Sequence, residues 1–171
     1  MAKYETERML IEEATLKDAE FFFQLLNSPN WLEFIGDRNI QTIQDAQMYI
    51  HSSLINSYEK NGFGLYKMTL KENKQTVGIC GLVKRPRLQH PDIGFAILPD
   101  FAGKGYTTEA ALATLDFAHH KLNINTILAI TTENNVKSRH LLKKIGMKFI
   151  ETITFEENKQ EYLLYNHSSF Q

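Results

Sequence analysis

The 171-residue sequence contains a single cysteine, Cys80, so no disulfide can form within the chain. No apolar run approaches the ~20 residues of a membrane-spanning helix. The charged start MAKYETER lacks the apolar segment of a signal peptide. Neither charge is in excess, because 19 Lys and Arg stand against 20 Asp and Glu, whereas nucleic-acid-binding domains are usually clearly basic. The sequence therefore predicts a cytoplasmic protein that binds neither membrane nor nucleic acid.

Nothing in the sequence divides the chain into parts, since it has no internal repeat, no linker and no low-complexity stretch. A chain of this length buries about 70% of its unfolded surface, which is enough for a substantial core. We therefore expect one domain over residues 1–171, present as a monomer or a homodimer.

The stretch from Asp92 to Lys121 is the most informative part of the sequence. Residues 93–98 are apolar, which predicts a short strand buried on both faces and ended by Pro99, which has no N–H. A loop with two glycines follows at residues 102–107. Apolar residues then recur at helical spacing as far as residue 122, and Thr107 or Thr108 is the expected N-cap of that helix.

This succession of strand, loop and helix start is suited to binding an anion. Gly103 and Gly105 let successive N–H groups point at one group of oxygens, and the helix dipole and Lys104 add positive potential. The loop is neither a Walker A loop nor a G-x-G-x-x-G motif, because Thr108 stands at the third glycine of the latter. Taken alone, the loop is explained equally well as an ordinary strand-to-helix turn.

A second segment, NNVKSRHLLKKIGMKF, makes the pattern specific, since it has Asn135 and Ser138 three residues apart and then a Lys-x-Gly sequence. Together the two segments resemble the GNAT superfamily, the Gcn5-related N-acetyltransferases. The pyrophosphate loop of that family reads Arg/Gln-x-x-Gly-x-Gly/Ala. Gly105 matches it, whereas Ala102 and Thr107 differ from it.

The start of the chain extends this resemblance. The sequence ETERMLIEEATLKDAEFF is similar to the Thr-Glu-Arg-Leu opening of a subgroup that includes the ribosomal-protein N-terminal (alanine and serine) acetyltransferases. The resemblance therefore covers nearly the whole chain.

Periodicity along the chain predicts the remaining elements. It predicts strands over residues 8–14, 63–70, 76–84, 90–98, 125–132, 148–154 and 160–166. It predicts helices from about residue 15 to 26, from 42 to 60 and from 136 to 145, and a short helix near Trp31. This order predicts an α/β (α+β) fold with a mixed, mostly antiparallel central sheet flanked by helices on both faces. The same order is expected of the GNAT acyl-CoA N-acyltransferase fold.

The resemblance implies acetyl-CoA as the donor, with no metal. The residues it assigns to the cofactor are Phe95, Ala96 and Ile97 on the strand, Ala102, Gly103, Lys104, Gly105, Tyr106 and Thr107 in the loop, and Asn135 and Ser138 beyond it. The amide of Ile97 would face the thioester oxygen. Leu142 stands where many members have a tyrosine, so Ser138 is the expected acid for the leaving thiolate; alternatively, Ser138 only begins its helix.

The acceptor side is less well defined by the sequence. Trp31, Phe34 and Ile35 form an apolar connection that either packs against the core or forms one wall of an acceptor pocket, and these two interpretations are compatible. The candidate general bases are Glu133, Glu156, Glu157, Asp92 and His90, each of which is also explained as a solvated loop charge. The absence of a strong base favours an α-amine, whose pKa of ~8 leaves part of it neutral at pH 7, or another amine of low pKa.

The sequence thus predicts an acetyl-CoA-dependent N-acetyltransferase that acts on a primary amine, such as a protein N-terminal α-amine or a small amine. Two alternatives are a degenerate acyl-CoA-binding regulatory module and a structural domain without a cofactor. His119 and His120 are expected to stabilise the end of a helix. Cys80 is expected to be a buried core residue.

Overall fold

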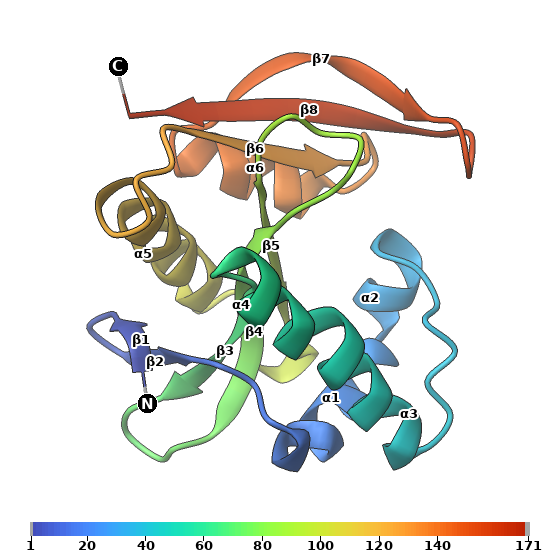
Figure 1. Ribbon diagram of the computed structural model, residues 1–171, viewed down its shortest axis with the longest axis vertical. Coiled ribbons are helices and arrows are strands. Elements are labelled where there is room, and N and C mark those ends of the chain that lie inside the picture. Colours follow the sequence, from blue (N-terminus) through green and yellow to red (C-terminus); the bar gives the residue numbers. More distant parts are fainter. Residues whose placement is uncertain (1, 170–171) are drawn as a thin grey trace.

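The computed structural model describes residues 2–169, which are built around one eight-stranded sheet (Figure 1). The strands follow the spatial order β1-β2-β3-β4-β5-β6-β8-β7. Their bounds are β1 (Ala2–Glu5), β2 (Met9–Glu12), β3 (Leu65–Leu70), β4 (Thr76–Val83), β5 (Asp92–Ile97), β6 (Thr126–Thr131), β7 (Lys148–Phe155) and β8 (Gln160–Ser168). Neighbouring strands are antiparallel except for β5 and β6. The predicted mixed, mostly antiparallel sheet is therefore confirmed.

Helices cover both faces of this sheet. They are α1 (Ala19–Leu26), α2 (Pro29–Phe34), α3 (Ile43–Tyr49), α4 (Asn56–Asn61), α5 (Tyr106–His120) and α6 (Val136–Lys144). A π-helical turn, Ile50–Ile55, joins α3 to α4, so residues 43–61 form one continuous helical segment. The predicted helix and its Thr42 N-cap are confirmed, because the Thr42 side chain accepts from the N–H of Asp45 and the Asp45 carboxylate accepts from the N–H of Thr42.

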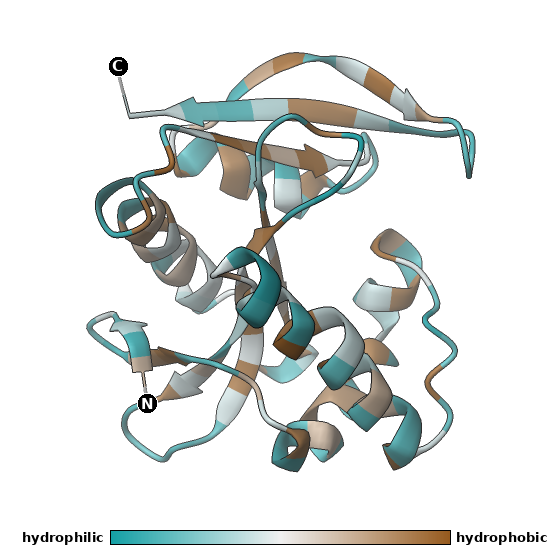
Figure 2. Ribbon diagram, viewed as in Figure 1, coloured by the Kyte–Doolittle hydropathy of each residue, from teal (hydrophilic) through white to brown (hydrophobic). Residues whose placement is uncertain are grey.

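Two apolar clusters lie on opposite faces of the sheet, and the alternation of side chains along each strand explains this division. On β4, Cys80 packs with α5 and α6 in the first cluster, whereas its neighbour Ile79 packs with α1, α2 and α3 in the second. On β5, Phe95 belongs to the first cluster and Ala96 to the second. Figure 2 shows hydrophobic colours along the inner strands and hydrophilic colours on the β4–β5 loop and the β7–β8 turn. The predicted burial of Cys80 is confirmed, and burial raises the pKa of its thiol to about 12.

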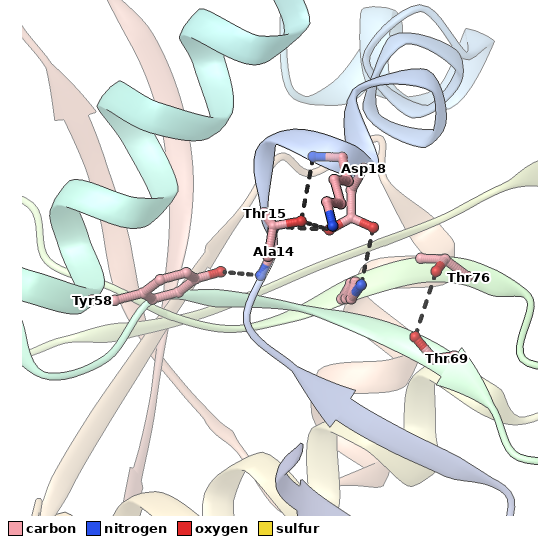
Figure 3. Close-up of polar contacts among 8 residues, drawn as sticks. Ala14, Thr15, Asp18, Tyr58, Thr69 and Thr76 are labelled. Atoms are coloured by element: carbon pink, nitrogen blue, oxygen red, sulfur yellow. Dashed lines mark hydrogen bonds and ion pairs between the residues drawn. The ribbon is translucent and has the colours of Figure 1, made fainter. Parts of the chain in front are cut away.

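Polar contacts hold the corner between β2 and α1 (Figure 3). Thr15 and Asp18 form a capping box at the start of the helical segment. The Tyr58 hydroxyl accepts the N–H of Ala14 at 3.1 Å, and Lys67 of β3 donates to Asp18 at 2.9 Å. The expected start of a helix at Thr15 is therefore confirmed, and the corner is tied to both α4 and β3.

Strand β1 was not expected from the sequence. Its four residues, AKYE, are too short and too polar to give an alternating signal. The strand forms because it pairs with β2 and because the Tyr4 ring stacks on Phe117 of α5, with 4.5 Å between the ring centroids.

Candidate active site

The sheet opens between β5 and β6, the two parallel strands at its centre. A single register pair, Asp92 with Leu128, joins them. Beyond Ile93, the residues of β5 are only half buried, so the expectation of a strand buried on both faces was wrong. The physical reason is the opening itself, because the side of β5 that faces β6 has no strand paired against it past Asp92.

The main chain of β5 presents polar groups to this opening. The N–H of Leu98 donates to the carbonyl of Val77 on β4. Because main-chain groups of successive strand residues point to opposite sides, those of Phe95 and Ile97 point away from β4 and toward β6. Ala96, by contrast, directs its main chain at β4. Two of the three β5 residues predicted to contact the donor therefore have amide groups facing the opening.

The glycine loop lies just after this strand. Gly103 and Gly105 both have left-handed backbone conformations, with φ of 78° and 83°. Gly105 is itself the N-cap of α5, and no side chain caps that helix, so the predicted caps Thr107 and Thr108 were wrong. A left-handed glycine lets the helix begin earlier, which places both threonines in its first turn. The first N–H groups of a 15-residue helix are thus left without a side-chain partner, as an anion site requires.

A residue far away in the sequence completes this loop. Arg8, just before β2, donates from Nη1 to the carbonyl of Lys104 at 3.0 Å and from Nε to Glu109 at 2.7 Å. Its guanidinium lies over the Tyr106 ring, 4.3 Å from the centroid. No local pattern connects residue 8 with residues 104–109, so sequence reasoning missed this contact. Lys104 itself lies over Phe101, with its Nζ 5.6 Å from the ring centroid.

The second predicted segment begins α6. Asn135 is the N-cap of this helix, and its Oδ1 accepts the N–H of Ser138 at 3.2 Å. This leaves the Asn135 amide nitrogen as the group that can bind a ligand. Within residues 2–169 the Ser138 hydroxyl has no hydrogen-bond partner. Both residues therefore lie at one helix start. The Asn135 amide N–H and the Ser138 hydroxyl, which the prediction needs as hydrogen-bond donors, are still available.

On the face of the sheet opposite α5 and α6, a cavity of about 640 Å³ lies between the β4–β5 loop and the β7–β8 hairpin. Its apolar floor consists of Leu128, Ile153 and Leu164. Arg87 spans the cavity, because its Nε donates to Glu157 at 2.7 Å and its guanidinium lies over the Phe155 ring at 4.9 Å. Leu128 belongs to the one pair that joins β5 to β6, so the cavity meets the opening at its closed end.

Asp92 is the most buried of the candidate bases. Its side chain points to the same face as its strand partner Leu128, which lines the cavity. The Asp92 side chain is 2% exposed and accepts from Arg85 Nε at 3.0 Å. Burial raises the pKa of Asp92 to about 6, although Arg85 opposes this rise. By contrast, Glu157 is held by Arg87 and its pKa is lowered, and Glu133 and Glu156 are exposed.

The residues predicted for the acceptor wall lie elsewhere on this face. Trp31 is 4% exposed within the second apolar cluster, so the interpretation of α2 as a short helix packed on the core is confirmed. The indole Nε1 of Trp31 is buried without a hydrogen-bond partner among residues 2–169. Phe34 is half buried and Ile35 is 41% exposed. A role for these three residues in acceptor binding stays a prediction.

The expected role of the two histidines near the end of α5 is met differently by each. His119 Nδ1 lies 2.6 Å from the carbonyl of Ile124, and its Nε2 lies 2.9 Å from His167 Nδ1 on β8. His120 instead contacts Asp116 within its own helix. His119 therefore connects the end of α5 to β8.

Comparison with known proteins identifies this arrangement. The family model described as acetyltransferase (GNAT) domain matches residues 8–148, and the chain belongs to this family of N-acetyltransferases, which are acyltransferases. The uncharacterised N-acetyltransferase YnaD of Bacillus subtilis is 27% identical over 143 residues, which cover 84% of this chain and 81% of that protein.

Two solved structures share the fold. The ribosomal-protein-S5-alanine acetyltransferase of Vibrio fischeri has a TM-score of 0.81 at 15% identity, and the match covers 98% of this chain and 97% of that one. The microcin C7 self-immunity acetyltransferase MccE, in complex with acetyl-CoA and AMP, has a TM-score of 0.78 at 17% identity over 95% of this chain and 93% of that one. The GNAT fold predicted from the sequence is therefore confirmed.

Among residues 2–169, no helix combines the length and the apolar character needed to cross a bilayer. The same residues contain no group of three or more His, Cys, Asp or Glu side chains placed to hold a metal ion.

Proposed function

We propose that this chain, as a single cytoplasmic domain, transfers the acetyl group of acetyl-CoA to a primary amine. One observation carries the proposal: the opening between β5 and β6 has an uncapped helix N-terminus on one face of the sheet and a cavity on the other. Two substrates can thus reach the same point from opposite faces, as direct transfer between them requires.

The residues present fit the donor. An added Cβ at Gly103 would meet open space, and the first N–H groups of α5 have no side-chain cap, so the loop can receive a pyrophosphate. The main chains of Phe95 and Ile97 can pair with the pantetheine arm as an added strand would. When bound, acetyl-CoA supplies a thioester whose C–S bond breaks as the amine nitrogen bonds to the carbonyl carbon.

Three groups of the chain can serve this reaction. The Ile97 N–H, which faces the opening, can donate to the thioester oxygen as negative charge develops on it. Asp92, with a pKa raised to about 6, is ionised near neutral pH and can accept the proton that the amine loses. Ser138, with its hydroxyl free, can donate a proton to the leaving sulfur.

We favour a peptide N-terminal α-amine as the acceptor, with a small amine as the alternative. A base of pKa about 6 is too weak to deprotonate a lysine amine of pKa ~10.4 efficiently, but it suits an α-amine of pKa ~8. The structural likeness to a ribosomal-protein-S5-alanine acetyltransferase supports the same choice. The cavity, with an apolar floor and an open rim, has the size of a small-molecule site and could hold the first residues of a peptide.

The test is thiol release from acetyl-CoA with a panel of N-terminal peptides, amino acids and polyamines. We expect release with at least one amine, whereas CoA binding without release for any acceptor would favour the regulatory module.

Asp92→Asn should lower kcat at least a hundredfold while CoA still binds, because a general base contributes about 10²–10⁴-fold. The rate of the wild type should rise with pH through about 6, since the base acts only when deprotonated, and the variant should lose this rise. Glu133→Gln, at an exposed candidate base, is the matched control and should keep both the rate and its pH dependence. Unchanged turnover in Asp92→Asn would exclude Asp92 as the base.

A further inference from the structure

Arg8 has no place in the proposed reaction, yet its side chain contacts the donor loop at Lys104 and at Tyr106. We infer that Arg8 is a positioning residue for the phosphates of the donor, acting through the loop and through Glu109. This role rests on the proposed function, because it needs a phosphate-bearing ligand at residues 102–107.

Arg8 holds the loop on both sides of Gly105. On one side its Nη1 donates to the carbonyl of Lys104 at 3.0 Å. On the other side its Nε and its backbone N–H donate to the two oxygens of Glu109, at 2.7 and 2.9 Å. Arg8 therefore fixes the last residue before the helix cap and the first turn of α5 relative to each other.

The guanidinium also packs against the turn between these two contacts. It lies over the Tyr106 ring, and an added Cβ at Gly105 would be 3.3 Å from Arg8 Nη2. A loop with left-handed glycines at 103 and 105 has many conformations to lose when it binds a ligand. A rigid partner that holds the loop in one of them lowers that loss, so its effect should appear as donor affinity.

The charge of Glu109 also bears on phosphate binding. Glu109 lies in the first turn of α5, beside the N–H groups proposed to bind phosphate. Partial burial tends to raise the pKa of Glu109, but hydrogen bonds from Thr6 and from Arg8 outweigh it and lower the pKa. Glu109 is thus a carboxylate, and without Arg8 its charge would repel a phosphate at the same helix end. Arg8 cancels that charge where the phosphate would bind.

A purely structural role for Arg8 makes a different prediction. If its bonds only joined β2 to α5, removing them would lower the stability of the fold and weaken the binding of every ligand of the site by the same factor. If Arg8 positions the phosphate loop, its removal should weaken the binding of ligands that carry phosphates and leave the binding of ligands without phosphates unchanged. Coenzyme A carries phosphates and pantetheine has none, so comparing their binding distinguishes the structural role from the positioning role.

The experiment measures the Kd of CoA by calorimetry and that of pantetheine by NMR titration, together with the melting temperature. The proteins are the wild type, Arg8→Gln and Arg8→Lys. The matched control is Lys3→Gln, which removes an exposed ion pair with Glu13 in the same N-terminal region. We expect Arg8→Gln to raise the Kd of CoA about tenfold, the effect of losing one charge-assisted contact. The Kd of pantetheine should change less than twofold.

Arg8→Lys should give an intermediate Kd for CoA, because lysine restores the charge but lacks the guanidinium that donates to Lys104 and Glu109 at the same time. In turnover, Arg8→Gln should raise the KM of acetyl-CoA more than it lowers kcat. Lys3→Gln should leave both ligands unaffected.

Two results would overturn the inference. If Arg8→Gln binds CoA as tightly as the wild type, or loses CoA and pantetheine in equal proportion, Arg8 serves only the fold. If the wild type binds no CoA at all, the donor site itself fails and this role fails with it. The two failures are distinct, since only in the second does the wild-type protein fail to bind CoA.

Discussion

The proposed donor side and the proposed acceptor side of the opening are built in different ways. On the donor side, one unbroken segment from β5 through the glycine loop into α5 provides the main-chain groups, and α6 adds Asn135 and Ser138. On the acceptor side, side chains from distant segments meet, as when Arg87 reaches Glu157, 70 positions away. Asp92 belongs to the same strand as the donor groups but points to the other face.

This difference determines which substitutions each side is expected to tolerate. Main-chain donors depend on backbone conformation, so substitutions that change φ should abolish donor binding whatever side chain they add. Side-chain contacts across a cavity can be replaced or lost one at a time, so the acceptor side should respond in smaller steps.

Gly105→Val should have the largest effect. A β-branched residue resists the left-handed conformation of Gly105, and its side chain would meet Arg8. Loss of two charge-assisted main-chain contacts corresponds to about a hundredfold weaker CoA binding or more, to be measured by calorimetry on the folded variant. Gly62→Val is the control, because Gly62 has a similar φ of 77° at the end of α4. If both variants lose only stability, the assigned loop is not the phosphate site.

Ser138→Ala should lower the single-turnover rate of acetyl transfer by roughly ten- to a hundredfold, the low end of acid–base effects, while CoA binding is unchanged. The reason is that charge develops on sulfur only as the thioester breaks. The comparison variant is Asn135→Ala, which should instead weaken CoA binding and remove an N-cap worth about 1 kcal/mol. A wild-type rate in Ser138→Ala would show that this serine only begins the helix.

Arg87→Ala should act on the acceptor side alone. Without the contact to Glu157, the β4–β5 loop is no longer held across the cavity, and the KM of the acceptor should rise roughly three- to tenfold, as for one lost polar contact. The melting temperature should barely change, since both side chains are exposed. Lys71→Ala, which removes a partly exposed ion pair with Glu5 near the other edge of the sheet, should change neither KM. An equal rise in the KM of acetyl-CoA would contradict the separation of the two sides.

The smallest effect concerns the contact between His119 and His167, which joins the end of α5 to β8. His119 Nδ1 must carry a proton to donate to the carbonyl of Ile124, so neutral His119 accepts at Nε2 from His167. Burial, aided by His119, lowers the pKa of His167 below its usual 6.5. The unfolded chain therefore binds more protons than the folded protein as the pH falls through about 6.5, and stability decreases there.

Solvent screens this pair, so we expect the melting temperature to fall by only roughly 2 °C between pH 7 and pH 5.5 on account of it. His167→Asn should remove this part of the pH dependence in a thermal melt. A pH dependence that is unchanged in the variant would assign it to other groups.

Much of the fold could be predicted because its elements carry local signals. Thr15 and Thr42 were identified as helix starts from their own sequence context, and both form capping boxes in the structure. Strand β1 could not be predicted, because its stability comes from pairing with β2 and from Tyr4 stacking on Phe117. The N-cap of α5 was misplaced for a related reason: threonine is the better cap by propensity, but the left-handed Gly105 begins the helix first.

The sequence by itself determined most of the strands and helices, the glycine loop and the Asn135–Ser138 segment, since each of these depends on residues within one short stretch. Only the tertiary structure decided that Arg8 braces the loop, that Arg87 spans the cavity, and that Asp92 is buried with a raised pKa. The physical reason is that long-range contacts and burial depend on which elements pack together. Residue spacing along the chain does not record that arrangement.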